Sequence, residues 1–265
     1  MNLDHPAALI IGAVLNDRRS AAQISVEAAA RRLRIPAIQL LDIEAGRGHV
    51  ARTDIHRLCS LYGVPDEGLA LSGMGQVAWY PGMGRPGPGN DPFATARYDR
   101  AHGSAERLST VVRHTLQVRW LAPRIPPPLR TPALAAADVL VPARIHWPAP
   151  RPGDVFILDE RALKGSRSKD TAVQIRHLLD LREAGAQIHL LPLPPHVGEV
   201  IELTLPGGTV LAHNHFHPAY QATDQSSADI DNALAATVTG PDPLEQALAH
   251  QSAAGLRAPD GRNPR

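Results

Sequence analysis

Between residues 7 and 63, apolar positions recur with the spacing of about 3.6 residues that is typical of amphipathic helices. Ser25 can cap one such helix, Pro36 suits the first turn of the next, and Gly46 follows it as a turn residue. Short helices joined by short connections form small bundles. The pattern therefore predicts four helices: one with Leu9, Ile11, Val14 and Leu15 on one face, two over residues 26–34 and 37–45, and one that begins near Asp54.

After residue 98 the pattern changes to helices that alternate with short apolar runs. Two of these runs flank Pro206-Gly207-Gly208, an order that is typical of a β-hairpin. Alternating helices and strands predict an α/β (α+β) domain with a small sheet. The predicted helices cover residues 99–120, 170–183 and 227–237, and the predicted strands cover residues 155–158, 187–191, 200–205 and 209–213.

A segment rich in glycine and proline separates the two regions. Residues 72–92 contain six glycines and four prolines, which is typical of a linker. The segment includes GMGRPG, a formal match to G-x-G-x-x-G, but no strand or helix is predicted beside it, which excludes a dinucleotide site of that type. The predicted organisation is a helical domain over 1–71, a linker over 72–98, a second domain over 99–240 and a frayed tail over 241–265.

Charge and cysteine content limit the classes of function. The formal net charge is +1, so no overall field attracts the chain to nucleic acid, and the first 65 residues contain eight arginines against six acidic residues. The single cysteine, Cys59, excludes an intramolecular disulfide and fits a reducing compartment. The longest apolar run, AALIIGAVL, is too short to span a bilayer. These features predict a cytoplasmic protein that does not insert into membranes.

The N-terminal region resembles the Cro/cI (XRE) type of helix-turn-helix domain. The resemblance runs without a gap from Ile24 to Gly46 and continues at Leu58 and Tyr62-Gly63-Val64. It implies that the second and third helices form the motif and that the third enters the major groove of DNA. The matching residues are Ile24-Ser25, Glu27, Ala30, Leu33, Ile35, Leu40, Ile43-Glu44 and Gly46.

The second half is similar to a C-terminal domain of unknown function that follows this helix-turn-helix in many actinobacterial proteins. The fragments that resemble it are IPPPLRTPALAAA (125–137), ILDERAL (157–163), QIRHLL (174–179) and IHLLPL (188–193). Such proteins are described as transcriptional regulators, some of them antitoxin-like, and are often encoded beside a small partner protein. The resemblance therefore implies a DNA-binding regulator, expected to be a homodimer, whose second domain senses a ligand or binds a partner protein.

The helix expected to read DNA departs from the family pattern. Where this chain has Val26, Pro36 and Leu41, the family usually has polar residues, and where it has Asp42 the family often has arginine. Without a compensating cation, the Asp42 carboxylate works against phosphate binding. On the face expected to be exposed, only Gln39 can pair with an adenine edge.

The basic residues around the motif are the candidates for contacts with DNA phosphates, because arginine is a good phosphate partner. The alternative is that these residues are solvated charges on small helices. The candidate DNA-contacting residues are Gln39, Arg31, Arg34, Arg47, His49 and Arg52, and the further basic residues nearby are Arg18, Arg19 and Arg32.

A second group of candidates lies in VLAHNHFHPAY (210–220). If the strand continues, its period of two places His213, His215 and His217 on one face. Imidazoles with this spacing can bind a divalent metal ion or supply a general base, whereas the alternative is a histidine-rich loop. The sequence indicates no other cofactor. The candidates for a further metal ligand are His196, Glu199 and Glu202.

Three functions are compatible with these patterns. The first is the DNA-binding regulator that the resemblance implies. The second is an enzyme of a specialised-metabolite pathway, cyclase-like or an acid-base catalyst, which has lost DNA reading and binds an apolar small molecule in its second domain. The third is an antitoxin-like protein that binds only a partner protein. The breadth of the resemblance favours the regulator.

Overall fold

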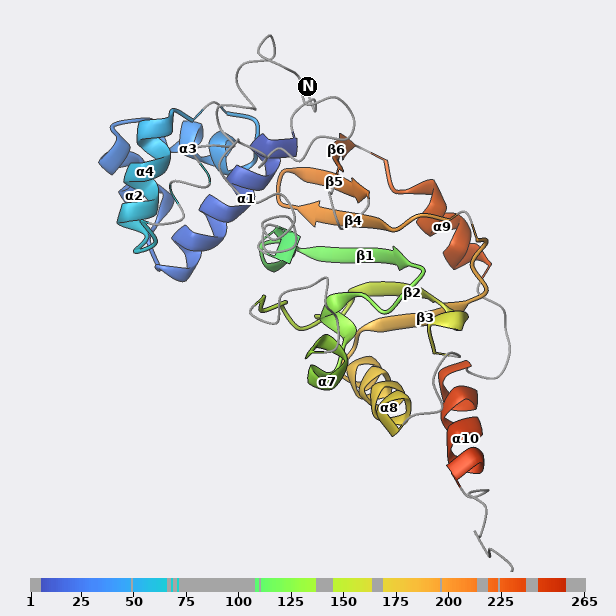
Figure 1. Cartoon of the computed structure of the whole chain (residues 1–265). Coiled ribbons are helices and arrows are strands. Elements are labelled where there is room, and N and C mark those ends of the chain that lie inside the picture. Colours follow the sequence, from blue (N-terminus) through green and yellow to red (C-terminus); the bar gives the residue numbers. More distant parts are fainter. Residues whose placement is uncertain are drawn as a thin grey trace, which may run out of the picture.

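The computed structural model describes residues 6–48, 50–65, 68, 71, 108–109, 111–136, 145–163, 169–195, 197–213, 219–223, 225–236 and 243–255. Within these residues, a bundle of four helices precedes a six-stranded sheet with helices on both faces (Figure 1). This arrangement confirms the predicted fold class, a helical unit followed by an α/β domain. The predicted linker over residues 72–98 lies outside the described residues.

The N-terminal bundle consists of α1 (Pro6–Ala21), α2 (Val26–Leu33), α3 (Ala37–Glu44) and α4 (Arg52–Leu61). Ser25 caps α2 as predicted, because its side chain accepts a hydrogen bond from the backbone N–H of Ala28 (3.2 Å). Arg34 adopts a left-handed conformation (φ 61°) that ends α2, and Pro36 precedes the first turn of α3. The local signals in the sequence are therefore sufficient to define the tight turn between α2 and α3.

The second domain is built on a mixed sheet with the strand order β3-β2-β1-β4-β5-β6. The first three strands along the chain pair in parallel, and the other pairs are antiparallel. The last two strands of the sequence-based prediction, β4 and β5, form the expected hairpin. The strands are β1 (Gln117–Ala122), β2 (Val155–Asp159), β3 (Gln187–Leu191), β4 (Val200–Leu205), β5 (Gly208–His213) and β6 (Ala219–Thr223).

Helices cover both faces of this sheet. On one face, α8 (Lys169–Glu183) buries Ile175 and Leu178 in the main core, to which Trp120 and Phe156 of the sheet also belong. On the other face, Ile230 of α9 (Ala228–Ala235) packs in a smaller core with Leu121 and Ile157. The remaining short elements are η1 (Pro127–Leu129), α7 (Pro132–Ala136) and η2 (Glu160–Leu163).

Two sequence-based predictions are wrong. The helix predicted over residues 99–120 does not extend to residue 120. Gln117–Ala122 instead form β1, the central strand that pairs with both β2 and β4. Within the tail predicted to fray over residues 241–265, Pro243–Gly255 form α10, which packs beside α8. Burial of Leu244 in the main core stabilises this helix. β6 was not predicted.

The middle of α1 is buried on every side, since all side chains from residue 9 to residue 15 lie in the interior. One side of α1 packs on α3 and α4, and the other packs on β4, β5 and β6. A helix that is apolar all round is typically such a buried helix, which explains the AALIIGAVL run. The bundle and the sheet therefore share one continuous core.

The hairpin between β4 and β5 also takes part in the contact between the sheet and the N-terminal bundle. A Cβ atom added at Gly207 would lie 2.0 Å from the carbonyl oxygen of Ala45, just after α3. The carboxylate of Asp17 on α1 also lies 2.9 Å from the imidazole Nδ1 of His114, just before β1. The position of α3 is thus set by contacts with the second domain as well as by the bundle.

Candidate nucleic-acid interface

One face of α3 is buried and the other is open to solvent. Leu40, Ile43 and Glu44 face the interior of the bundle. In contrast, Ile38 is 65% exposed, Leu41 is 43% exposed, and Gln39 is also exposed. The second domain therefore does not cover this face. A polar amide and two apolar side chains are presented together to solvent.

A buried ion pair holds α3 against α1. Arg19 donates hydrogen bonds from Nε and Nη2 to the two carboxylate oxygens of Glu44, at 2.7 and 2.9 Å. Its guanidinium also donates to the carbonyl oxygen of Ile24 (3.0 Å) and to Oδ1 of Asn16 (2.9 Å). The hydrogen-bonded Glu44 carboxylate raises the pKa of Arg19 above its ordinary value. The expectation that Arg19 is available to DNA is therefore wrong, because its donors are used inside the bundle.

The acidic residue on α3 has a cation beside it. Asp42 forms an ion pair with Arg47, with Oδ1 3.0 Å from Nη2. The backbone N–H groups of Arg47 and Gly48 both donate to the carbonyl oxygen of Asp42, which draws the chain after α3 back along the helix. This pairing supplies the compensating cation that the sequence pattern did not reveal. The negative charge of Asp42 is therefore offset on the surface expected to meet DNA.

This geometry agrees with the comparison with known protein families, in which residues 10–71 match the model of a helix-turn-helix domain. The match includes α2, α3, α4 and most of α1, and does not extend to the sheet. No curated protein and no solved structure matches the chain. Within the described residues, no helix is both long enough and apolar enough to cross a membrane.

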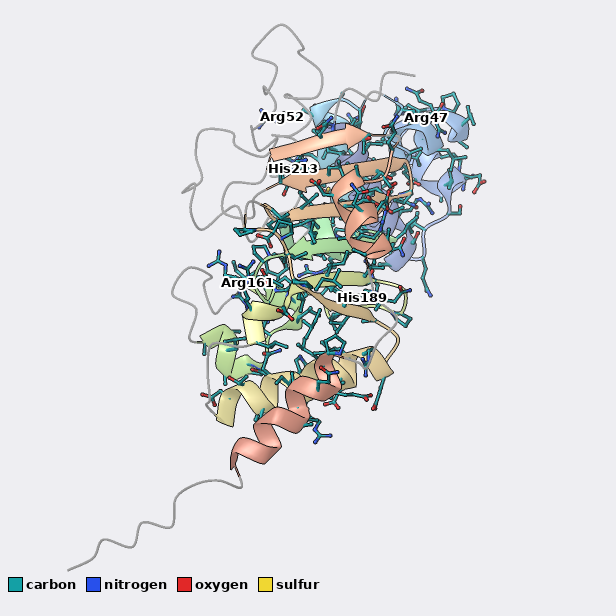
Figure 2. The ribbon with its side chains drawn as sticks, turned by 90° about the vertical axis from the view of Figure 1, so that its right-hand side faces the viewer. Arg47, Arg52, Arg161, His189 and His213 are labelled. Carbon is teal, nitrogen blue, oxygen red and sulfur yellow. The ribbon has the colours of Figure 1, made fainter. Side chains whose placement is uncertain are left out.

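Exposed arginines surround α3 in the helix-turn-helix domain. Arg31 and Arg34 project from the end of α2 and from the turn that leads into α3. Arg47 follows α3, and Arg52 is the first residue of α4 (Figure 2). His49 lies outside the described residues. The remaining candidates are thus placed at both ends of the exposed helix.

A basic hollow of about 660 Å³ lies between the end of α2 and α4. Arg32, Arg34, His56 and Arg57 line it together with Ser60. Arg57 is partly neutralised by Asp54 one turn earlier, at 3.4 Å. The hollow therefore extends the positive charge of the helix-turn-helix domain beyond α3, which favours contact with polyanions.

The histidine group at the end of β5 is described only in part. His213 lies in β5 opposite Val200, whereas His196, His215 and His217 lie outside the described residues. In the part of the chain that the structure describes, no group of three or more potential metal ligands is close enough to bind one ion. The proposed metal or catalytic role of His213, His215 and His217 therefore stays a prediction.

The two carboxylates that the sequence offered as further metal ligands have other partners. Glu199 accepts a hydrogen bond from the indole Nε1 of Trp120 (2.8 Å). Glu202 is buried and accepts two hydrogen bonds from Arg119 (2.9 and 3.2 Å) and one from the backbone N–H of Ser227 (2.7 Å). Arg119 also pairs with Asp231 of α9. These contacts attach α9 to the sheet, and sequence spacing gave no signal of them.

Proposed function

We propose that the protein is a DNA-binding transcriptional regulator that acts as a homodimer. The observation that supports this proposal most directly is the exposed face of α3, which the second domain leaves uncovered within a helix-turn-helix domain. The ion pair between Asp42 and Arg47 removes the main electrostatic objection to DNA binding. A dimer would place two copies of α3 in successive major grooves, about 34–36 Å apart along the duplex.

In this proposal the residues of α3 read the bases. Gln39 donates to and accepts from an adenine edge in the major groove. Ile38 contacts the methyl group of thymine, because an exposed apolar side chain gains most from burial against that group. Arg31, Arg34, Arg47, His49 and Arg52 bind phosphates on either side and set the position of the domain on the duplex.

The second domain is proposed to control this activity by binding a ligand or a partner protein. The buried helix α1 is shared by the helix-turn-helix domain and the sheet, so a shift of the sheet displaces α1 and with it α3. Catalysis or metal binding by His213, His215 and His217 has less support, since Glu199 and Glu202 are engaged in other contacts.

Gln39→Ala is expected to weaken binding to the operator by about tenfold, because a bidentate contact with adenine contributes about 1–3 kcal/mol of discrimination. Binding to an unrelated duplex should not change, since that binding depends on phosphate contacts. The measurement is fluorescence anisotropy with the protein's own promoter region and with an unrelated duplex, each at a low and at a physiological salt concentration.

The matched control is Gln221→Ala, which removes an exposed glutamine from β6 of the second domain and should leave both affinities unchanged. Equal binding of the wild type to both duplexes, lost at the higher salt concentration, would contradict the proposal. The helix-turn-helix would then serve as a structural or protein-binding domain.

A further inference from the structure

The basic hollow between α2 and α4 is built by residues that share one solvent-facing side of the bundle. Arg32 lies in the last turn of α2, and Arg34 ends that helix. Positions 56, 57 and 60 of α4 follow the spacing of a single helix face, which places His56, Arg57 and Ser60 together. The opposite face of α4 is buried in the bundle, so the packing of α4 also directs these polar side chains to the hollow.

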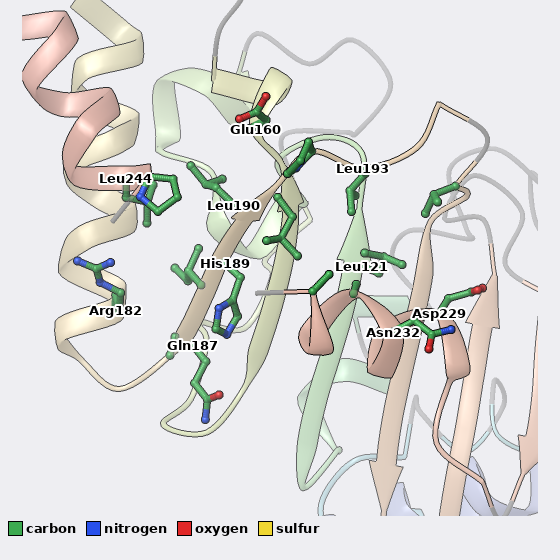
Figure 3. A pocket seen from close by; sticks show the side chains of 18 of the residues that line it. Leu121, Glu160, Arg182, Gln187, His189, Leu190, Leu193, Asp229, Asn232 and Leu244 are labelled. Carbon is green, nitrogen blue, oxygen red and sulfur yellow. The ribbon is translucent and has the colours of Figure 1, made fainter. Parts of the chain in front are cut away.

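The lining of the basic hollow contains no acidic residue among the residues that the structure describes. Its two other described residues are Leu33 and Leu61. The larger cavity of about 1060 Å³ beside β3 differs in this respect, because Glu160 and Asp229 line it together with Arg182 (Figure 3). A concave surface with charges of one sign concentrates counter-ions, so the basic hollow is the stronger candidate for an anion-binding site.

The arginines of the basic hollow are only weakly neutralised by the described chain. Arg57 pairs with Asp54 at 3.4 Å, and the Arg57 side chain is 66% exposed, so solvent screens this pair. Neither Arg32 nor Arg34 has an acidic partner among the described residues. The guanidinium of Arg19, by contrast, is held by a carboxylate inside the bundle. Two of the three guanidinium groups in the hollow are therefore available to an external anion.

The arginines at the end of α2 are not required to cap that helix. The backbone N–H of Arg34 donates to the carbonyl oxygen of Arg31 (3.2 Å), and the N–H of Ile35 donates to that of Ala30 (3.1 Å). These bonds satisfy carbonyl oxygens that the end of a helix otherwise leaves open. A role in capping α2 therefore does not account for the side chains of Arg32 and Arg34.

We propose that the basic hollow binds a small ligand with at least two adjacent phosphate groups, of the class of diphosphate and triphosphate esters. Guanidinium groups bind phosphate oxygens through paired hydrogen bonds, and Ser60 and His56 supply further donors. One phosphate group carries a charge of about −1.5 to −2 at pH 7, so it does not offset three arginines. The volume of about 660 Å³ suits a small-molecule site and leaves room for the organic part of such an ester.

The basic hollow lies beside the surface proposed to read DNA and is not part of it. No residue of α3 lines the hollow, and α3 is described over its whole length. Of the described residues proposed to bind DNA phosphates, only Arg34 lines it. The inference therefore goes beyond the proposed function, and binding of the phosphate ligand does not depend on binding of DNA.

The test is isothermal titration calorimetry of the full-length protein with inorganic triphosphate at physiological ionic strength. One site per chain is expected. Orthophosphate at the same ionic strength should bind at least about tenfold more weakly, because it reaches fewer of the guanidinium groups. Arg32→Gln should weaken triphosphate binding by about tenfold, since it removes charged hydrogen bonds. Arg32 is exposed, so this variant should fold as the wild type does.

The matched control is Arg31→Gln, the same change at the preceding position of α2. Arg31 is also exposed but does not line the basic hollow, so the affinity for triphosphate should change by less than about twofold. Both variants are then titrated with an unrelated DNA duplex by fluorescence anisotropy. Arg31 is proposed to bind a DNA phosphate and Arg32 is not, so only Arg31→Gln should weaken this binding. Failure of the proposed function and failure of this inference are thus recorded separately.

Three results would overturn the proposal. The first is triphosphate that does not bind, or that binds no more tightly than orthophosphate. The second is an Arg31→Gln variant that loses as much triphosphate affinity as Arg32→Gln, which would show attraction by the overall charge of the bundle. The third is an Arg32→Gln variant that loses as much affinity for the unrelated duplex as for triphosphate, which would identify the DNA backbone as the occupant of the hollow.

Discussion

Glu44→Ala is expected to lower the free energy of unfolding by about 3 kcal/mol. The reason is that the variant leaves the Arg19 guanidinium, which is only 13% exposed, without its carboxylate partner inside the bundle. Removing one partner of a buried ion pair costs far more than the pair itself contributes, because the remaining charge stays desolvated. Chemical denaturation followed by circular dichroism measures the effect.

The matched control is Asp42→Ala, two residues earlier on the same helix. Its partner, Arg47, is 47% exposed, and the carboxylate is 43% exposed, so solvent screens the pair. The expected loss is below about 1 kcal/mol. If Glu44→Ala costs no more than Asp42→Ala, the Arg19–Glu44 pair does not fix α3 on α1, and the orientation of α3 must depend on apolar packing alone.

The helices of the bundle could be predicted because their boundaries are encoded locally. Ser25, Pro36 and Gly46 each act within a few residues of the helix end that they define. The same holds for the hairpin at Pro206-Gly207, where a short turn joins two apolar runs. Elements of this kind can be predicted without knowledge of distant parts of the chain.

β1 could not be predicted in the same way, since its state depends on strands far along the chain. Residues 117–122 pair with 155–158 on one side and 200–204 on the other. A helix over residues 99–120 would place Leu116 and Trp120 on the same face, yet Trp120 is buried and Leu116 is 64% exposed. Tertiary pairing therefore overrides a local pattern that is compatible with either state.

The candidate interface, too, could be predicted only in part. Gln39 and the surrounding arginines could be placed from the resemblance, because a helix-turn-helix fixes which helix is exposed. The ion-pair partners of individual charged residues could not be predicted. Arg19 pairs with Glu44 across 25 positions, and Arg47 reaches back to Asp42 only because the chain turns after α3. Composition gives the number of charged residues but not the ion pairs that they form.

Gly12→Ala is expected to destabilise the protein by about 2–3 kcal/mol, although alanine is favoured over glycine inside a helix by about 1 kcal/mol. The added Cβ would lie 2.5 Å from the carbonyl oxygen of Ile43 and 2.7 Å from that of Glu44, both backbone atoms of α3. Backbone atoms cannot move aside as the end of a flexible side chain can, so α1 and α3 must separate. The measurement is the midpoint of thermal unfolding.

Gly198→Ala is the matched control, because a Cβ at that position meets no atom within 4 Å. It should be neutral or stabilising by up to about 1 kcal/mol, through the unfolded state. At temperatures where the Gly12→Ala variant is still folded, its preference for the operator should also fall, since α3 no longer lies where Arg19 and α1 hold it. A Gly12→Ala protein that is more stable than the wild type would show that α1 and α3 are not in backbone contact. It would also remove the physical basis of the proposed control of DNA binding by the second domain.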